Sequence, residues 1–304
     1  MVTMKRFSEL RFEEALSLWN EAFSQYYSDM TMDMDRFLQK ISGEGLSLEH
    51  SVAAVHENKL VGFVLNGFRE IDGKVYAWNG GTAILPECRG MKIGERLIAA
   101  CLDIYKEKNA DIAILEAISE NTRAIRLYEK MGYETFEKLA FLKHEGEMTV
   151  PFPASRDFIT IPGAPEQLES LPFHSKVTAW QTQLASIKDP RVALLQHNGE
   201  NVGYAVYRHV YQNGSLAAIL LYQCIVSPEL GERQKEAAQT LLDTVFSPNS
   251  TSCRRITMNL PVSNTAVYES LLSSGFEMMV GQVHMKMGIK NRHVTAADSE
   301  TALL

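Results

Sequence analysis

The stretch of residues 84–97 reads I-L-P-E-C-R-G-M-K-I-G-E-R-L, and the rest of the chain is organised around it. An apolar strand stops at Pro86, a short basic turn follows, and an amphipathic helix is expected to begin at Glu95. The first N–H groups of a helix lack partners within the helix and lie at the positive end of its dipole, so such a turn can hold an anion. Gly90 and Gly94 would let the backbone approach that anion closely. An ordinary strand-to-helix turn fits the same residues, so this stretch alone does not decide the function.

Length and composition indicate a globular protein with room for two domains. The chain has 304 residues, of which 45% are hydrophobic and 22% are charged, and each half is long enough to bury a core of its own. The formal net charge of −7 disfavours nucleic-acid binding, which needs a basic surface. The same charge is compatible with a cationic substrate such as an amine, without requiring one.

Targeting and redox signals favour a cytoplasmic location. The sequence has no run of about 18 or more apolar residues, so we expect no membrane span. Its first ten residues contain no apolar signal core. The four cysteines, at positions 88, 101, 224 and 253, show no C-x-x-C spacing. Zinc ribbons and disulfide frameworks are therefore not expected, and no metal is predicted.

Hydrophobic periodicity and turn residues predict an alternation of helices and strands in the first half. Two helices come first, then a hairpin and a strand in which Gly80 and Gly81 suggest a bulge or a close backbone approach. After the opening turn and its helix, a buried strand precedes a helix that Asn121 caps and Gly132 ends. The predicted elements are helices 12–23 and 34–41, strands 52–56, 60–65 and 75–85, a helix from 95, strand 112–115, helix 121–132 and a last strand after it. The order α-α-β-β-β-α-β-α-β indicates an α/β fold, a mixed sheet with helices on its faces.

The second half repeats motifs of the first at a nearly constant offset. Agreement at separated places predicts a second copy of the same fold. The composition breaks at residues 151–155, so we predict domains at residues 1–150 and 156–290, followed by a loose polar tail at 291–304. The repeated motifs are Val61-Gly62-Phe63 with Val202-Gly203-Tyr204, Pro86-Glu87 with Pro228-Glu229, and Asn121-Thr122 with Asn264-Thr265, at offsets of 141, 142 and 143 residues.

Two motifs of the first half resemble those of the GNAT superfamily of acyl-CoA-dependent N-acetyltransferases. The family's loop pattern, Gln/Arg-x-x-Gly-x-Gly/Ala, corresponds to residues 89–94, with Lys92 in place of the middle glycine. The family's second pattern, Asn-x-x-Ala-x-x-Leu-Tyr-x-x-x-Gly-Phe/Tyr, is met in full between Asn121 and Tyr133. The resemblance covers residues 1 to about 150 well and the second half in outline, so it implies two tandem GNAT-like folds. Lys92 costs little if its φ is negative and roughly 1 kcal/mol if its φ is positive.

The resemblance implies acetyl-CoA as the co-substrate. In the family, backbone N–H groups of the loop and of the helix start hold the CoA pyrophosphate. Arg89 either adds a charge-assisted contact or is a solvated side chain, and Asn121 would contact the cofactor in addition to capping its helix. Backbone groups of the preceding strand would pair with the pantetheine arm as an added strand does. The predicted cofactor-binding residues are Ala83, Ile84, Leu85, Arg89, Gly90, Met91, Lys92, Ile93, Gly94, Glu95, Arg96 and Asn121.

The catalytic residues implied by the resemblance are Tyr128 and Glu116. The Tyr128 phenol would donate a proton to the departing thiolate, because its ordinary pKa of about 10 lies near that of a thiol at about 8.5. Glu116 ends the buried strand and would serve as the base, as the equivalent glutamate does in ribosomal-protein alanine N-acetyltransferases. Three alternatives stay open. Tyr128 could be a core residue, Glu116 could merely line the groove, and water relays could run through Tyr76, Asn79 or Glu120.

The second copy lacks these groups. Alignment on Pro228 places Gly231, Gln234 and Glu236 where the first copy has Arg89, Lys92 and Gly94. Alignment on Asn264 places Leu271 at the position of Tyr128. A glutamate at a phosphate turn opposes an anionic ligand. We therefore expect residues 156–290 to be a degenerate domain that shapes the acceptor site or mediates assembly.

These observations predict an N-acetyltransferase with one active site in the first half. It would transfer the acetyl group directly to a primary amine of a small molecule or of a peptide N terminus. A homodimer is left open, and no nucleic-acid or membrane partner is expected. Two alternatives stand beside this reading: a non-catalytic acyl-CoA-binding sensor, and a tandem-fold aminoacyl transferase that uses charged tRNA.

Overall fold

The computed structural model describes residues 1–27 and 29–289, and its contacts divide the chain into two compact units. Unit 1 comprises Met1–Leu115, Arg126–Glu134 and the described end of the chain from Lys286. Unit 2 comprises Glu116–Ile125 and Thr135–Met285. Neither unit is continuous in sequence, and the predicted domain ranges, 1–150 and 156–290, stay predictions. The predicted tail at 291–304 lies outside the described residues.

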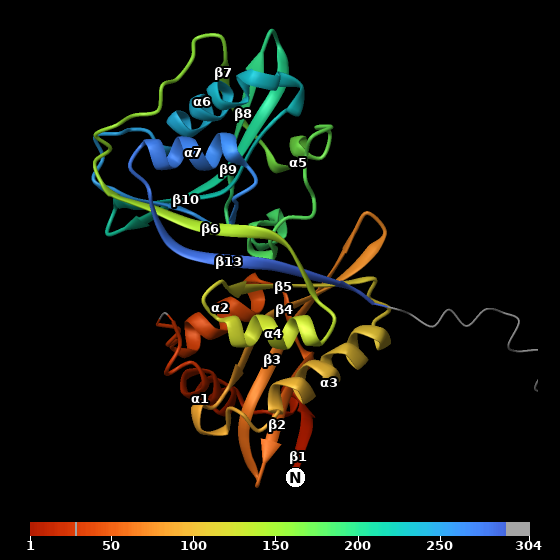
Figure 1. Cartoon of the computed structure of the whole chain (residues 1–304). Coiled ribbons are helices and arrows are strands. Elements are labelled where there is room, and N and C mark those ends of the chain that lie inside the picture. The colour runs from red at the N-terminus through yellow and green to blue at the C-terminus, as the bar shows by residue number, and fades with distance from the viewer. Residues whose placement is uncertain (28, 290–304) are drawn as a thin grey trace, which may run out of the picture. The chain divides into compact units, whose positions relative to one another are not determined.

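Unit 1 is built on a mixed sheet in the strand order β1-β2-β3-β4-β5 (Figure 1). The β4–β5 pair is parallel and the other pairs are antiparallel. The last residues of β5 and the first of α4 belong to unit 2. The elements are β1 (Val2–Arg6), η1 (Phe7–Glu9), α1 (Phe12–Ala22), α2 (Met34–Gly43), β2 (Leu46–His56), β3 (Lys59–Ile71), β4 (Lys74–Ile84), η2 (Pro86–Cys88), α3 (Ile93–Glu107), β5 (Ile112–Ile118) and α4 (Thr122–Lys130).

Two of these elements correct the sequence-based expectation. The predicted order began with a helix, whereas the chain begins with β1, which pairs antiparallel with β2 from Val2–His56 to Arg6–Val52. The segment is only 5 residues long, too short for its alternation to stand out as a pattern. Helix α3 begins at Ile93, two residues before the predicted start at Glu95. The last two residues of the predicted turn, Ile93 and Gly94, already belong to the helix.

Helices cover both faces of the unit 1 sheet. On one face, Phe63 of β3 stacks with Trp19 of α1 at a centroid distance of 5.5 Å. On the other, Asn66 of the same strand accepts a hydrogen bond from the Tyr105 hydroxyl of α3 at 2.7 Å. Successive side chains of a strand point to opposite faces, so an odd position and an even position of β3 meet different helices. The third strand is therefore buried on both sides, which fixes the register of its neighbour β4.

Unit 2 holds strands in the order β13-β6-β11-β10-β9-β8-β7, and β12 pairs with β6. The β10–β11 pair is parallel, as β4–β5 is in unit 1. Within residues 1–27 and 29–289, no helix is long and apolar enough to cross a membrane. The elements are β6 (Glu134–Gly146), β7 (Ile159–Gly163), α5 (Pro165–Leu168), η3 (Trp180–Thr182), η4 (Leu184–Ser186), β8 (Arg191–His197), β9 (Glu200–Gln212), β10 (Ser215–Val226), η5 (Pro228–Arg233), α6 (Gln234–Phe246), β11 (Cys253–Thr257), β12 (Leu260–Pro261), α7 (Thr265–Ser273) and β13 (Glu277–Gly288).

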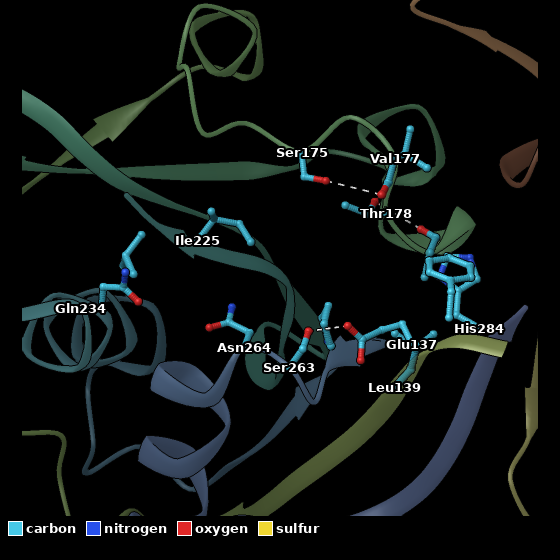
Figure 2. Close-up of a pocket in the computed structure, with 14 residues that line it drawn as sticks. Glu137, Leu139, Ser175, Val177, Thr178, Ile225, Gln234, Ser263, Asn264 and His284 are labelled. Carbon is cyan, nitrogen blue, oxygen red and sulfur yellow. Dashed lines mark hydrogen bonds between the residues drawn. The ribbon is translucent and has the colours of Figure 1, made fainter. Parts of the chain in front are cut away.

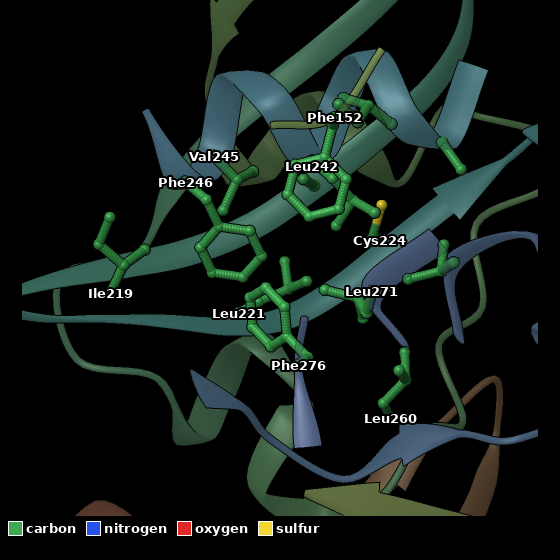
Figure 3. Packing of buried hydrophobic residues seen from close by; sticks show 14 of the residues in the cluster. Phe152, Ile219, Leu221, Cys224, Leu242, Val245, Phe246, Leu260, Leu271 and Phe276 are labelled. Atoms are coloured by element: carbon green, nitrogen blue, oxygen red, sulfur yellow. The ribbon is translucent and has the colours of Figure 1, made fainter. Parts of the chain in front are cut away.

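An aromatic and aliphatic core joins helices α6 and α7 to the unit 2 sheet (Figure 3). Phe246 at the end of α6 contacts Phe276, which follows α7, at a centroid distance of 5.1 Å. Leu271 of α7 is fully buried in the same cluster. This core holds the second half together without any of the groups that the first half was predicted to use for chemistry.

The sequence repeat is also a repeat of backbone contacts. The Leu85 N–H donates to the Val61 carbonyl at 2.9 Å, and the Ser227 N–H donates to the Val202 carbonyl at 2.7 Å. The glycine that follows Val61 lies against β4: a Cβ on Gly62 would lie 2.9 Å from the Ala83 carbonyl oxygen. A Cβ on Gly203, the equivalent glycine, would lie 3.1 Å from the carbonyl oxygen of Ile225. Glycine recurs here because two strands approach too closely for a side chain.

The helices that follow repeat in the same way. Helix α7 starts and ends 143 residues after α4. The Tyr133 N–H donates to the Tyr128 carbonyl at 3.0 Å, and the Phe276 N–H donates to the Leu271 carbonyl at 3.1 Å. Both helices end at a glycine with a positive φ, +101° and +86°, which is the usual conformation of a helix C-terminal glycine. The two halves therefore share one local architecture from strand to final helix.

Candidate active site

Strand β4 leaves part of one edge open where it approaches the turn. On the β3 side it is paired as far as Gly62–Ile84. On the other side, the ladder with β5 ends, among the described residues, at Asn79–Leu115, although β4 continues to Ile84. Gly80 marks the change: it is the extra residue of a bulge, as predicted. The end of β4 thus offers backbone groups to an added ligand strand.

The turn after β4 brings the chain into α3 through two residues with positive φ. Gly90 has a φ of +95°, and Lys92, the N-cap of α3, has a φ of 58° and a ψ of 20°. Of the two cases considered for Lys92, a negative and a positive φ, the structure shows the positive one. Lysine therefore occupies a left-handed position here, at a cost of roughly 1 kcal/mol. Lys92 is exposed and provides no side-chain cap. The first N–H groups of α3 therefore lack the side-chain acceptor that an ordinary N-cap supplies, which suits an external anion.

Gly94 has a packing role. A Cβ at this position would lie 2.8 Å from Cδ2 of Leu127 and 3.3 Å from Cδ1 of Ile84. The start of α3 therefore packs directly against α4 and against the end of β4. Lys130 of α4 and Glu95 of α3 form an ion pair at 2.8 Å at the same place. The two family-like motifs are thus in contact, and each positions the other.

Arg89 is committed to the fold. Its Nε donates to the Ile84 carbonyl and its Nη2 to the Ala22 carbonyl, both at 3.3 Å. These bonds tie the turn to β4 and to the end of α1. A contact from Arg89 to a phosphate stays a prediction.

Tyr128 lies on α4, with 7% of its surface exposed. Burial raises the pKa of its phenol to about 12, although hydrogen bonding with the side chains of Thr82 and Asn79 lowers it in part. Thr82 and Asn79 also bond each other, the Asn79 Nδ2 donating to Thr82 Oγ1 at 2.8 Å. The phenol is therefore protonated at neutral pH and lies beside two polar side chains of β4. Thr82 was not predicted from the sequence; its position three residues after Asn79, next to the bulge, is the only signal that could have found it.

The structure places Glu116 and Asn121 in unit 2, whereas the other predicted site residues are in unit 1. The Glu116 side chain is 6% exposed, and its Oε1 accepts a hydrogen bond from the Trp180 N–H at 3.0 Å. The same oxygen lies 3.6 Å from Nε2 of His284, a neighbour 168 positions away that no sequence pattern indicated. Asn121 accepts from the Ala124 N–H at 3.2 Å, as the capping prediction requires.

In the second half, charged side chains of the chain itself lie at the equivalent turn. Its turn, η5, runs directly into α6, where the Gln234 N–H donates to the Gly231 carbonyl. Glu236, in the first turn of α6, forms an ion pair with Arg233 at 3.0 Å. Arg233 in turn reaches Asp157 at 3.0 Å. A carboxylate of the chain thus lies where a bound anion would be expected, and its pKa is lowered by hydrogen bonding with Ser155 and with Arg233.

Comparison with known proteins finds sequence similarity in the first half and similarity of fold over almost the whole chain. Residues 12–133 match the model of the acetyltransferase (GNAT) family, a range that contains every predicted site residue. The N-alpha-acetyltransferase 30 of Schizosaccharomyces pombe is 35% identical over 57 residues, which are 19% of this chain and 38% of that protein. The chain therefore matches less than half the length of this relative.

Two solved structures cover almost the whole chain. A GCN5-related N-acetyltransferase from Sphaerobacter thermophilus aligns with a TM-score of 0.68 at 15% identity, over 95% of this chain and 96% of its own. A tandem GNAT protein from the clavulanic acid biosynthesis pathway aligns with a TM-score of 0.59 at 14% identity, over 95% and 99%. At such identities the likeness shows the fold alone, and that fold is the predicted mixed α/β architecture of tandem GNAT proteins.

Proposed function

Because residues 12–133 match the model of the acetyltransferase (GNAT) family, we propose that this chain is an N-acetyltransferase that uses acetyl-CoA and a primary amine. The observation that carries the proposal is the continuity between the open end of β4 and the start of α3, which has no side-chain cap. An extended arm and an anionic group are the two recognisable parts of CoA next to its thioester. A strand edge followed by a helix N terminus can bind both.

Binding would use the backbone more than side chains. The backbone of Ala83, Ile84 and Leu85 would pair with the pantetheine arm, and the N–H groups of residues 90–96 would bind the pyrophosphate. Lys92 and Arg96 are exposed cations at that end of α3 and would add attraction for phosphate. Gly94 keeps α3 close to β4, so that the edge and the helix start form one continuous surface.

The reaction forms one N–C bond and breaks one C–S bond. A neutral amine attacks the thioester carbonyl carbon, one proton leaves the nitrogen, and one proton reaches the departing sulfur. A backbone N–H at the end of β4 would polarise the carbonyl. We assign the proton on sulfur to Tyr128, because its buried phenol stays protonated at neutral pH. Its pKa of about 12 lies above that of a thiol, so the transfer must accompany C–S cleavage for donation to be efficient.

Glu116 is the candidate for the group that takes the proton from the amine. It is a buried carboxylate within β5, two residues before the strand ends, and its hydrogen bond from Trp180 holds its orientation. A water relay through Asn79 is the alternative that the structure favours, since Asn79 belongs to the polar group around Tyr128. Glu116→Gln separates the two: a strong loss of kcat with an altered pH profile supports Glu116, and an unchanged profile supports the relay.

For the acceptor we propose a primary α-amine, with a peptide N terminus ahead of a small-molecule amine. The support is the sequence match to a protein named N-alpha-acetyltransferase 30. A homodimer and a cytoplasmic location stay sequence-based predictions.

Thiol release from acetyl-CoA, measured against a panel of peptides and small amines, tests the proposal. The expected result is amine-dependent release by the wild type and a large loss in Tyr128→Phe. The rival reading, a non-catalytic acyl-CoA sensor, predicts that both proteins bind CoA and that neither turns over.

A further inference from the structure

Unit 2 contains a cavity of about 340 Å³ at the place that corresponds to the proposed CoA site of the first half (Figure 2). Its wall includes Ile225 near the end of β10, Gln234 at the start of α6 and Asn264 just before α7. Ala83, Lys92 and Asn121 hold the equivalent positions in the first half. The volume lies within the usual range for sites that bind small molecules.

The charges around this cavity are wrong for CoA. None of the 14 described residues that line it is a lysine or an arginine. The nearby start of α6 is occupied by the Glu236–Arg233 ion pair. The lining residues do include one carboxylate, that of Glu137. An anionic ligand would meet this negative charge without a compensating cation in the wall.

Glu137 places a carboxylate in the cavity wall. It lies on β6 and accepts hydrogen bonds from the Ser263 hydroxyl and, at 2.7 Å, from the Lys138 N–H. Both donors are neutral, so they orient the carboxylate without balancing its charge. Figure 2 shows Glu137 and Ser263 joined in this way beside the labelled Leu139. A cation in the cavity would complete the set of partners.

His284 of β13 forms another part of the cavity wall. Its ring lines the cavity, is 3% exposed and packs on Phe136 with ring centroids 4.3 Å apart. Its buried Nε2 makes no hydrogen bond within the described residues, and it lies 3.6 Å from Glu116 Oε1.

We propose that this cavity binds a small primary amine in its ammonium form, with Glu137 as the counterion. Apolar side chains of Leu139, Ile225 and Val226 line the same wall and would cover the hydrocarbon part of the amine. The second half would then keep the cleft but bind a cation there, where the first half is proposed to bind an anion. This proposal does not rest on acetyl transfer in the first half.

Calorimetric titration of the full chain with 2-phenylethylamine and with its uncharged counterpart 2-phenylethanol tests the proposal. We expect the amine to bind saturably and the alcohol to bind at least about tenfold more weakly. Glu137→Gln should weaken amine binding by about tenfold. Glu145→Gln, which removes an exposed carboxylate from the same strand β6, should leave it unchanged.

Amine bound elsewhere in the molecule is distinguished by the variants. Ile225→Trp would fill the cavity and should abolish the component that Glu137→Gln weakens, with folding checked by thermal unfolding. Equal binding of amine and alcohol, or amine binding that survives both Glu137→Gln and Ile225→Trp, would overturn the proposal.

Discussion

Both halves of this chain place a strand, a turn that begins with a proline, and a helix in the same order. Neither of the two helices has a side-chain cap, but in the first half the turn leads into α3 through the left-handed Lys92. In the second half, η5 runs straight into α6, and Glu236 and Arg233 pair across the junction. The strand contacts beneath the turns are the same in both halves, down to the close approach at Gly62 and Gly203. Comparing the halves therefore separates the residues that build the fold from those that bind a ligand.

The largest expected effect lies at the paired positions Tyr128 and Leu271. Tyr128→Phe should lower kcat by about 10²- to 10⁴-fold, the usual worth of a positioned acid, with little change in stability. Leu271→Ala should lower the free energy of unfolding by about 2–5 kcal/mol, because it opens a cavity in a packed core. Steady-state kinetics and urea unfolding of both variants provide the check. If Tyr128→Phe loses stability and keeps its kcat, Tyr128 is a core residue like its counterpart.

A buried titratable group in unit 2 gives the next effect, on acid stability. Burial lowers the pKa of His284 to about 4, and Glu137 opposes this shift; Glu116 also faces the ring. The unfolded chain then binds the proton more tightly than the folded chain, so stability is complete above about pH 6.5 and falls as the pH drops towards 4. The loss is of the order of 3 kcal/mol at most.

Urea unfolding of wild type and His284→Gln at a series of pH values between 7 and 4 measures this contribution. The variant should lose less stability over that range. Equal pH dependence in the two proteins would show that the imidazole is protonated, or exposed, in the folded state.

The parts of the site that could be predicted from sequence are those set by local chemistry. The strand, the turn, the helix start and the Asn121 cap follow from glycine, proline and periodicity over a few residues. The role of Gly94 could not be found in this way, because it depends on Leu127 of another helix. The effect of burial on Tyr128 depends likewise on the folded surroundings, which raise the pKa of its phenol instead of easing proton donation. The contact of Glu116 with Trp180 and His284 joins segments far apart in the chain, and no spacing encodes it.

Charge reversal at the paired helix starts should affect CoA binding in the first half alone. Lys92→Glu places a carboxylate beside the start of α3, as Glu236 does for α6, and should weaken CoA binding by roughly tenfold. Gln234→Glu, the matched change in the second half, should have no effect. Calorimetric titration with CoA gives affinity and stoichiometry together, and one equivalent per chain is expected. Two equivalents would show that the second cleft binds CoA after all and that it is not degenerate.

The smallest effect concerns the backbone of the same pair. Lys92 is left-handed, with a φ of 58°, whereas Gln234 is right-handed, with a φ of −56°. Lys92→Gly should therefore raise the free energy of unfolding by about 1 kcal/mol through relief of strain. Gln234→Gly should lower it by up to about 1 kcal/mol, as glycine does in an ordinary helical position. Opposite signs in urea unfolding would establish that the two turns differ in backbone conformation as well as in charge, and equal signs would contradict it. If Lys92→Gly also binds CoA more weakly, the lysine is retained for its charge at the cost of that strain.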